Sequence, residues 1–394
     1  MLMKRPTVYD DAQPTISRRG LIAATLAAAA TCAVRAPAGA VPAVSLAAAA
    51  RHTGRFYGSA VRIDQVNAEP DLRDAVLREC AYVVPEIEMN WDQIEPTRGQ
   101  LEFAKMDDLA AFALANGKRV RGHTLLWHLA VPDWAVSLLR ETQDWSVIAR
   151  YFGSVIPRYG DVISQWEVVN EPIDPGHRAD GLRDDIFLAV FGPHYINRAL
   201  AQARTFAPHA QLIVNDYGLE YDIPEERERR YLLLKLLERL RRENAPLDAL
   251  GMQGHLDLRK GHVSAPSIAA FMRSVAGLGL SIVVTELDVK EADYVASVEE
   301  RDQRAADEVR RYLDVVLGER GVLGVTTWGL SDRHSWLQLT LEDFARFPGA
   351  WSSGGGPGFN RGLPFDAAMA PKPMFYAMRD ALWSVRGPKA HKRE

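Results

Sequence analysis

The feature that most constrains the fold of this chain is a regular alternation of short apolar runs with amphipathic helical patterns. A first apolar run lies near residues 55–61, and others follow at 81–86, 118–124, 164–170, 211–215, 249–255, 281–287 and 322–329. Helical patterns lie between and after them, at 70–80, 104–116, 145–158, 191–206, 224–243, 265–277, 296–318 and 371–386. Strands that alternate with helices at this spacing predict a parallel sheet with crossover helices.

Eight such units in about 340 residues fit an α/β fold of the closed (β/α)8 type, the TIM barrel. The alternative is an open, doubly wound sheet. No G-x-G-x-x-G motif follows any of the runs, so a dinucleotide-binding fold has little support. Hydrophobic residues make up 47% of the chain, which is ample material for a large core. We therefore predict one barrel domain over residues 53–390.

Residues 1–40 have the pattern of an export signal. Arg18 and Arg19 precede an Ala-rich apolar stretch that ends in Ala38-Gly39-Ala40. This pattern predicts a twin-arginine signal peptide with a small-residue cleavage site, in preference to a membrane anchor. We expect export by the twin-arginine route, to the periplasm or the medium, and no membrane association after cleavage.

Loss of residues 1–40 would change the formal net charge from −4 to −7, since this segment holds five basic and two acidic residues. A mildly acidic protein is a poor candidate for binding nucleic acid or anionic lipid. Cys80 would be the one cysteine left, which excludes an intrachain disulfide. We expect a monomer that is stabilised by its core.

Polar and aromatic side chains follow nearly every predicted strand. They are Glu86 and Glu88; His123, Trp127 and His128; Asn170 and Glu171; Asn215, Asp216 and Tyr217; Gln253 and His255; Glu286 and Asp288; and Trp328. In a barrel the C-terminal ends of the strands meet on one face, where active sites lie. One polar strand end is usually a satisfied loop contact, but such a succession of them predicts a site.

Two carboxylates on opposite walls of an aromatic-lined cleft are typical of glycoside hydrolysis. Indole rings stack on sugars, while amide and imidazole groups bind hydroxyls. A serine hydrolase has less support because the chain has no G-x-S-x-G elbow. His123 and His128 lack a third ligand with zinc spacing, so we expect no catalytic metal and no cofactor. A non-catalytic sugar-binding barrel is a further alternative, against which the intact pair Glu171 and Glu286 argues.

The motifs WEVVNEP, VTELD, HTLLWH, VNDYG, GMQGH, TTWGLSDRHSW and LPFDAAMAPKPMFYAM, spread over residues 53–386, together resemble glycoside hydrolase family 10, the endo-β-1,4-xylanases. The resemblance implies a retaining hydrolase of xylan or a related β-glycan, with Glu171 as acid/base and Glu286 as nucleophile. It implies that Asn170 holds the sugar 2-hydroxyl and that His255 bridges Glu286 and Asp288. Further implied binding and support residues are Glu86, His123, Trp127, His128, Gln253 and Trp328, with Tyr217 and Trp336 along the cleft.

The chain departs from this family pattern at a few positions. The family usually has E-N-E-M-K-W where this chain has EIEMNW, so Ile87 replaces an asparagine and Asn90 a lysine. Leu129-Ala130 stands where the family often has Ser-Gln. These positions serve the non-reducing side of the cleft, which keeps a different or decorated β-glycan, or a bacterial polysaccharide, open as the substrate. The Gly-rich insert at 340–362 is interpreted as a flexible loop, with a cover over the leaving-sugar side as the alternative.

Overall fold

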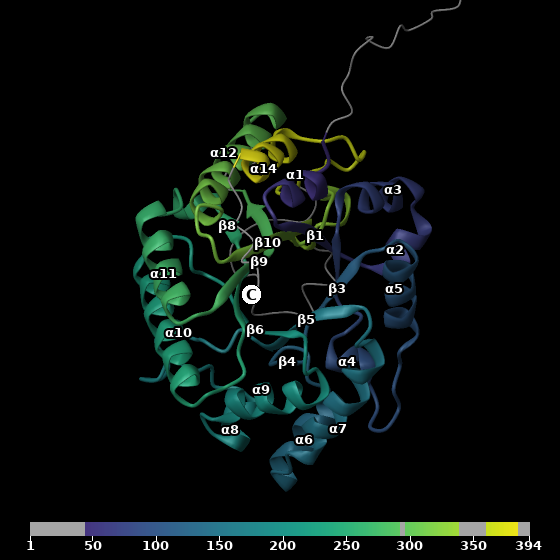
Figure 1. Ribbon diagram of the computed structural model, residues 1–394, viewed down its shortest axis with the longest axis vertical. Helices are drawn as coiled ribbons and strands as arrows, with labels where there is room; N and C mark the ends of the chain where they lie inside the picture. The colour runs from purple at the N-terminus through teal and green to yellow at the C-terminus, as the bar shows by residue number, and fades with distance from the viewer. Residues whose placement is uncertain (1–43, 292–295, 339–359, 385–394) are drawn as a thin grey trace, which may run out of the picture. The chain divides into compact units, whose positions relative to one another are not determined.

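The computed structural model describes residues 44–291, 296–338 and 360–384. Within them, eight parallel strands form a closed barrel that is surrounded by helices (Figure 1). The strands pair in the order β10–β1–β2–β3–β5–β6–β7–β9, and β10 also pairs with β9, which closes the barrel. The predicted (β/α)8 barrel is confirmed. The predicted signal peptide, Trp351 and most of the Gly-rich insert lie outside the described residues.

The barrel strands are β1 (Phe56–Val61), β2 (Tyr82–Pro85), β3 (Arg119–Gly122), β5 (Ile163–Asn170), β6 (Gln211–Asp216), β7 (Ala249–Met252), β9 (Ser281–Lys290) and β10 (Val322–Thr327). The helices around them are α1 (Leu46–His52), α2 (Ile63–Ala68), α3 (Pro70–Glu79), α4 (Trp91–Ile94), α5 (Ala104–Ala115), α6 (Asp133–Thr142), α7 (Ser146–Val155), α8 (Ile186–Phe191), α9 (Tyr195–Phe206), α10 (Pro224–Arg242), α11 (Ala265–Gly277), α12 (Val298–Val316) and α14 (Pro373–Ser384).

The strands bury both of their faces, which explains their nearly continuous apolar sequences. Successive side chains of a strand point to opposite faces. In β6, Leu212 and Val214 belong to the large core shared with the helices, whereas Ile213 belongs to a small cluster with Ala249 and Val283 of the next two strands. The large cluster is thus the layer between the barrel and the helices, and the small cluster fills the barrel interior.

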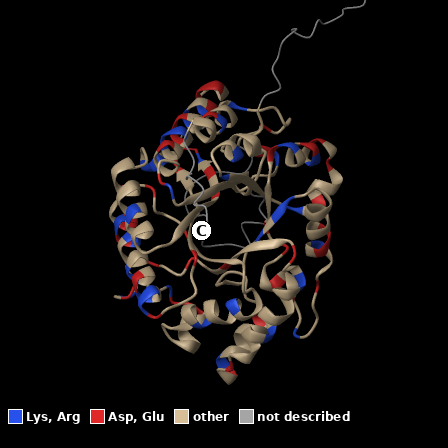
Figure 2. Ribbon diagram, in the orientation of Figure 1, with Lys and Arg blue, Asp and Glu red and all other residues tan. Residues whose placement is uncertain are grey.

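The helices begin where the sequence supplies a start signal. Proline is the first residue of α3 and of α10, where its missing N–H costs nothing. Ser297 and Glu300 form a reciprocal capping box at the start of α12. Lysine, arginine, aspartate and glutamate gather on the outer helices, as Figure 2 shows, which is expected of amphipathic helices that pack one face on a barrel.

The body of the domain begins earlier than residue 53, where the predicted domain started. Helix α1 precedes it, and Leu46, Ala49 and Ala50 of this helix are fully buried. The backbone N–H of Leu46 donates to Glu79 Oε2 at 2.9 Å, which ties α1 to the end of α3. Helix α1 therefore belongs to the barrel domain.

Two short strands extend the sheet beyond the barrel. Strand β4 (Leu126–Trp127) pairs with the end of β5 and sets Trp127 opposite Asn170. Strand β8 (His255–Asp257) pairs with the end of β9 and sets His255 opposite Asp288. The single strand predicted over 249–255 is thus divided, because Gly254 turns the chain with a φ of 77°.

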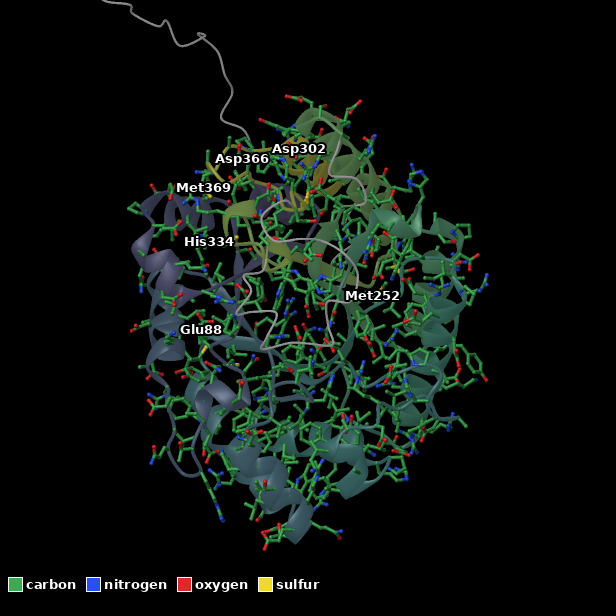
Figure 3. The ribbon with its side chains drawn as sticks, turned by 180° about the vertical axis from the view of Figure 1, so that it is seen from behind. Glu88, Met252, Asp302, His334, Asp366 and Met369 are labelled. Carbon is green, nitrogen blue, oxygen red and sulfur yellow. The ribbon has the colours of Figure 1, made fainter. Side chains whose placement is uncertain are left out.

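Buried and half-buried ion pairs hold the segment after β10 in place. Lys372 Nζ lies 2.7 Å from Asp332 Oδ2, and Arg361 Nη2 lies 2.7 Å from Asp302 Oδ2 of α12. On the other side, His334 pairs with Glu69 between α2 and α3 at 2.9 Å. Asp302 and His334 are labelled in Figure 3. The segment that carries Trp336 is therefore tied by ion pairs to α12 and to the junction of α2 and α3.

Candidate active site

Glu171 and Glu286 are joined by a chain of side-chain amides. Asn215 Nδ2 donates to Glu286 Oε1 at 2.7 Å and to Asn170 Oδ1 at 2.9 Å. Asn170 Nδ2 lies 3.3 Å from Glu171 Oε1, and Gln253 Nε2 lies at the same distance from this oxygen. Four predicted strand ends, those of β5, β6, β7 and β9, thus contribute to one constellation.

The orientation of Asn215 is determined by its neighbours. Thr285 Oγ1 donates to Asn215 Oδ1 at 2.7 Å, so the NH2 group must face Glu286 and Asn170. Strand β7 leaves room for this side chain because it carries Gly251 there. A Cβ at that position would lie 2.2 Å from Asn215 Oδ1. A substitution of Gly251 would therefore displace the amide that connects the two carboxylates.

Glu171 has an unusual backbone. Its φ is 57°, in the left-handed region that few residues other than glycine adopt. Its N–H donates to the carbonyl of Asn215 at 2.8 Å, and Pro172 follows directly. Strained backbone of this kind concentrates at functional sites, where the surroundings must stabilise it.

His255 lies between two carboxylates, as predicted. Its Nδ1 is 2.8 Å from Asp288 Oδ1 and its Nε2 is 3.1 Å from Glu286 Oε2. Burial disfavours the imidazolium, but the two carboxylates outweigh it and raise the pKa of His255 to about 10. Trp336 Nε1 donates to the other oxygen of Asp288. At neutral pH, both ring nitrogens of His255 are therefore donors, and one of them binds Glu286.

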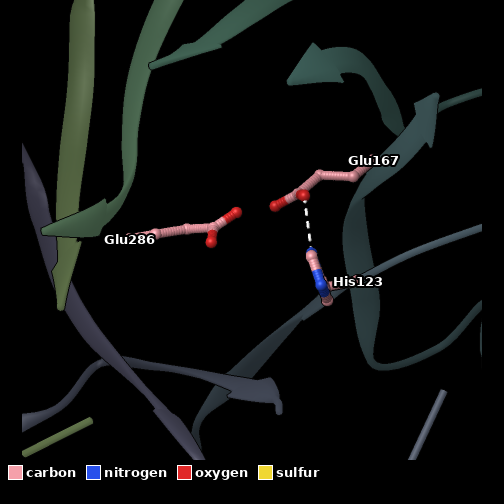
Figure 4. A group of neighbouring side chains, drawn as sticks. All are labelled: His123, Glu167 and Glu286. Carbon is pink, nitrogen blue, oxygen red and sulfur yellow. Dashed lines mark hydrogen bonds and ion pairs between the residues drawn. The ribbon is translucent and has the colours of Figure 1, made fainter. Parts of the chain in front are cut away.

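Glu167, which was not among the predicted site residues, lies beside this group. His123 Nδ1 is 2.8 Å from Glu167 Oε2, and the Glu286 carboxylate faces Glu167 across a short gap (Figure 4). Arg121 Nε lies 2.7 Å from Glu167 Oε1 in an ion pair, and Arg121 also donates to the carbonyl of Thr285 at 2.6 Å. Burial opposes protonation of His123, but Glu167 outweighs it and raises the pKa of the imidazole.

An irregularity in β5 explains how Glu167 reaches the site. Alternation along a regular strand would place Glu167 and Asn170 on opposite faces. Glu167 pairs with Ile213 and Val169 with the next residue of β6, so β5 contains one extra residue between them. The extra residue turns both side chains toward the barrel axis. The motif WEVVNEP gives no signal for this extra residue.

His123, Glu167 and Glu286 offer atoms that all lie within 4.8 Å of one another, which is a spacing that a metal ion could bridge. Arg121 already occupies one oxygen of Glu167, and all three side chains are buried. A cation there would be placed close to the guanidinium, which is unfavourable. The arrangement fits a proton and hydrogen-bond network better than a metal centre.

His123, Trp127 and Trp328 form an aromatic group in the site. The ring of His123 lies 4.8 Å from that of Trp328 and 6.1 Å from that of Trp127. Trp127 Nε1 and His128 Nδ1 are buried and have no hydrogen-bond partner among the described residues. Burial, together with the positive charge of Arg183, lowers the pKa of His128 to about 3. A ligand hydroxyl would satisfy such groups.

Tyr217 and Glu86 each interact with arginine side chains. The hydroxyl of Tyr217 accepts from Arg183 at 3.0 Å, and the guanidinium of Arg229 lies 4.1 Å from its ring centroid. Glu86 pairs with Arg62 at 3.3 Å. Arg183 and Arg229 belong to no motif in the sequence, and both were missed.

The positions that depart from the family pattern differ in their exposure to solvent. Leu129 is 44% exposed, whereas Asn90 is 2% exposed and its Oδ1 has no partner within the described parts of the chain. The N–H of Asp92 donates to the carbonyl of Ala130 at 3.0 Å, so the turns after β2 and β4 lie against each other. Ile87 is half-buried in the first of these turns.

No helix in the described ranges combines the length and apolar character needed to cross a bilayer.

Comparison with known proteins identifies the family. The family model for glycosyl hydrolase family 10 matches residues 45–381. The chain is 30% identical over 318 residues to endo-1,4-beta-xylanase A of Fusarium oxysporum f. sp. lycopersici, covering 78% of this chain and 92% of the relative. It is 29% identical over 311 residues to endo-1,4-beta-xylanase B of Thermotoga neapolitana, covering 77% and 81%.

Solved structures give the same result. The native xylanase 10B of Thermotoga maritima superposes with a TM-score of 0.73 at 27% identity, over 86% of this chain and 98% of that one. Xylanase 10B of Thermotoga petrophila, solved in complex with xylobiose, superposes with a TM-score of 0.73 at 26% identity, over 87% and 98%. The chain belongs to glycosyl hydrolase family 10.

Proposed function

We propose that this glycoside hydrolase is a retaining endo-1,4-β-xylanase in which Glu286 is the nucleophile and Glu171 the acid/base. The observation that carries the assignment is the unequal hydrogen bonding of the two carboxylates. Glu286 accepts from Asn215 at 2.7 Å and from His255 at 3.1 Å, while Glu171 has two amide contacts at 3.3 Å. Hydrogen bonds from an amide and an imidazolium favour a carboxylate, which is what a nucleophile must be.

The reaction then proceeds in two steps. An oxygen of Glu286 attacks the anomeric carbon while Glu171 gives its proton to the leaving glycosidic oxygen, so the glycosidic bond breaks and a glycosyl ester forms. Glu171, now a carboxylate, takes a proton from water, and the water oxygen attacks the same carbon and releases Glu286. Asn170 and Gln253 lie next to Glu171 and can bind the hydroxyls of the reacting sugar.

The substrate polymer is supported by the named xylanases to which the chain is similar and by the xylobiose complex of one structural relative. A second candidate is a decorated β-glycan. It is favoured by the exposed Leu129 and by Ile87, because apolar side chains cannot bind the hydroxyls of an unsubstituted sugar.

Incubation with a panel of polysaccharides, followed by mass analysis of the products, tests the substrate. Proton NMR of the first product tests the mechanism. We expect xylo-oligosaccharides with β configuration at the new reducing end. Products of α configuration would refute the retaining mechanism, and release from another glycan alone would refute the substrate.

We further propose export of the enzyme by the twin-arginine route, to the periplasm or the medium. The support is Arg18 and Arg19 before the Ala-rich stretch of the sequence. An exported enzyme would meet a polysaccharide that is too large to enter the cell.

A further inference from the structure

Arg183 binds the backbone on which the acid/base is carried. It lies in the segment between β5 and α8, and its Nε donates to the carbonyl of Glu171 at 2.8 Å. Its Nη2 lies 3.2 Å from the carbonyl of Ile173 and 3.0 Å from the hydroxyl of Tyr217. One guanidinium therefore joins the turn after β5 to the end of β6.

A second arginine fixes the same turn from the opposite side. Arg229 of α10 donates from Nη1 to the carbonyl of Ile173 at 2.6 Å and lies 3.4 Å from Asp216 Oδ1. Its guanidinium covers the ring of Tyr217 at 4.1 Å. Arg183 and Arg229 thus share two partners, Ile173 and Tyr217, which restricts where the Arg183 guanidinium can lie.

Arg183 retains much of its positive charge for its surroundings. Its side chain is 14% exposed, so water screens it only in part. The carboxylate of Asp174 lies 3.7 Å from Nη1, which is longer than a hydrogen-bonded ion pair, and the three hydrogen-bonded partners are neutral oxygens. Burial disfavours the guanidinium, but Tyr217 and, after it, the carboxylate of Glu171 outweigh burial and raise the pKa of Arg183, so Glu171 interacts with this charge.

We propose that Arg183 is a positioning residue for Glu171: it holds the left-handed backbone of the acid/base, and its charge favours the carboxylate that Glu171 becomes when it protonates the leaving oxygen. The inference rests on the proposed function. Interaction with a group that gains charge in the transition state accelerates the chemical step. Loss of the charge should therefore lower kcat/KM most for substrates whose leaving groups need the proton.

Several other ionisable groups interact with Glu171 or with Arg183 and its partners, and their effects must be separated from that of Glu171 in a test. Asp216 and Tyr217 belong to the end of β6, Arg229 belongs to α10, and Asp174 lies in the same turn. His128 faces Arg183 from the turn after β4, and Glu286 and His255 lie across the amide chain. His128 is neutral above about pH 3. Burial raises the pKa of Asp216 to about 6 against the effect of Arg229, so Asp216 titrates within the working range.

The experiment compares Arg183→Met, Arg183→Lys and the matched control Arg178→Met with the wild-type enzyme. Arg178 lies in the same segment, is 42% exposed and pairs with Asp180 at 2.9 Å. Values of kcat/KM are measured on xylobiosides with dinitrophenyl and with alkyl leaving groups, and pH–rate profiles are recorded on xylo-oligosaccharides. Glu171→Ala serves as the reference for complete loss of the acid.

We expect Arg183→Met to lose at least tenfold on alkyl xylobiosides and less than threefold on the dinitrophenyl substrate. The alkaline limb of its profile should move to higher pH, since loss of a neighbouring cation disfavours the ionised form of a carboxyl group. Arg183→Lys keeps a charge but loses the planar set of N–H donors. It should show the alkaline limb of the wild type at a reduced rate. Arg178→Met should match the wild type in both.

An equal loss on both leaving groups with an unmoved alkaline limb would overturn the proposal and leave Arg183 a purely structural role. If Arg183→Met does not fold, the Lys variant decides: a limb that moves despite the retained charge refutes the electrostatic role. If Glu171→Ala itself shows no dependence on the leaving group, the acid/base assignment fails, and this outcome is distinct from failure of the Arg183 inference.

Discussion

The double change Ile87→Asn with Asn90→Lys tests what the unusual side of the cleft recognises. Both positions lie in the turn after β2, against the turn that carries Leu129. Ile87 has no hydrogen-bonding group in its side chain. Asn90 is 2% exposed, and the Oδ1 of its side chain lacks a partner among the described residues. A lysine would reach about two bonds further than an asparagine.

The expected gain follows from the hydrogen bonds restored. An amide–hydroxyl hydrogen bond contributes about 0.5–1.5 kcal/mol, and one from an ammonium about 1.5–3 kcal/mol. Together the two changes should contribute about 2–4 kcal/mol, if the effects are roughly additive. At about 1.4 kcal/mol per decade this corresponds to roughly 30- to 1000-fold. The gain should appear in kcat/KM because contacts remote from the reacting bond help to hold the reacting sugar in the transition state.

The assay is hydrolysis of linear xylo-oligosaccharides, with thermal unfolding as a check that the buried lysine is tolerated. A gain of at least tenfold supports the reasoning. The control Leu114→Asn makes a comparable change at a leucine of the outer helix α5 that is 58% exposed, and it should alter nothing. The reasoning is refuted if the wild-type enzyme already acts on these substrates at the rate of ordinary xylanases, or if the folded double variant is slower.

Three further predictions concern the pair of carboxylates, metals and export. Glu286→Ala should remove nearly all activity, and azide should restore turnover with an inverted glycosyl azide product; a product of retained configuration would contradict the assignment of the nucleophile. Dialysis against a chelator should leave the rate unchanged, and a large loss that one added metal reverses would contradict the prediction of no catalytic metal. Replacement of Arg18 and Arg19 by lysine should retain activity in the cytoplasm, and unchanged export would show that another route is used.

Much of the barrel could be predicted from periodicity, because each strand is buried on both faces and each helix has one apolar face. The additional elements could not. Helix α8 lies before the predicted helix 191–206, and it has only six residues, too few for a recognisable period. Strands β4 and β8 are two and three residues long and exist only through their pairing with β5 and β9. Such elements depend on tertiary contacts that no local pattern encodes.

The site shows a similar division. Residues that end a strand, such as Asn170 and Gln253, converge because parallel strands of a barrel end on one face. Arg183 could not be found in this way, since its role comes from contacts with main-chain carbonyls that any sequence supplies. Glu167 could not be found because its orientation depends on an extra residue in the β5–β6 ladder. Prediction of either residue would require the strand register and the turn geometry to be known beforehand.

The surroundings of the two buried acids favour Glu286 over Glu167 as the proposed nucleophile. Both carboxylates have a partner on each oxygen. The partners of Glu167 are Arg121 and His123. Glu167 is completely buried, with 0% exposure. Glu286 is 4% exposed, and its partners are the neutral amide of Asn215 and, at 3.1 Å, the imidazolium of His255, which also pairs with Asp288. A carboxylate held by a guanidinium inside the barrel would lose an ion pair on bonding to carbon, which is costly for a buried cation. Glu167 is therefore suited to orienting His123. When Glu286 bonds to carbon in the proposed mechanism, the His255 imidazolium keeps Asp288 as its counter-ion, so this buried cation is not left without a carboxylate.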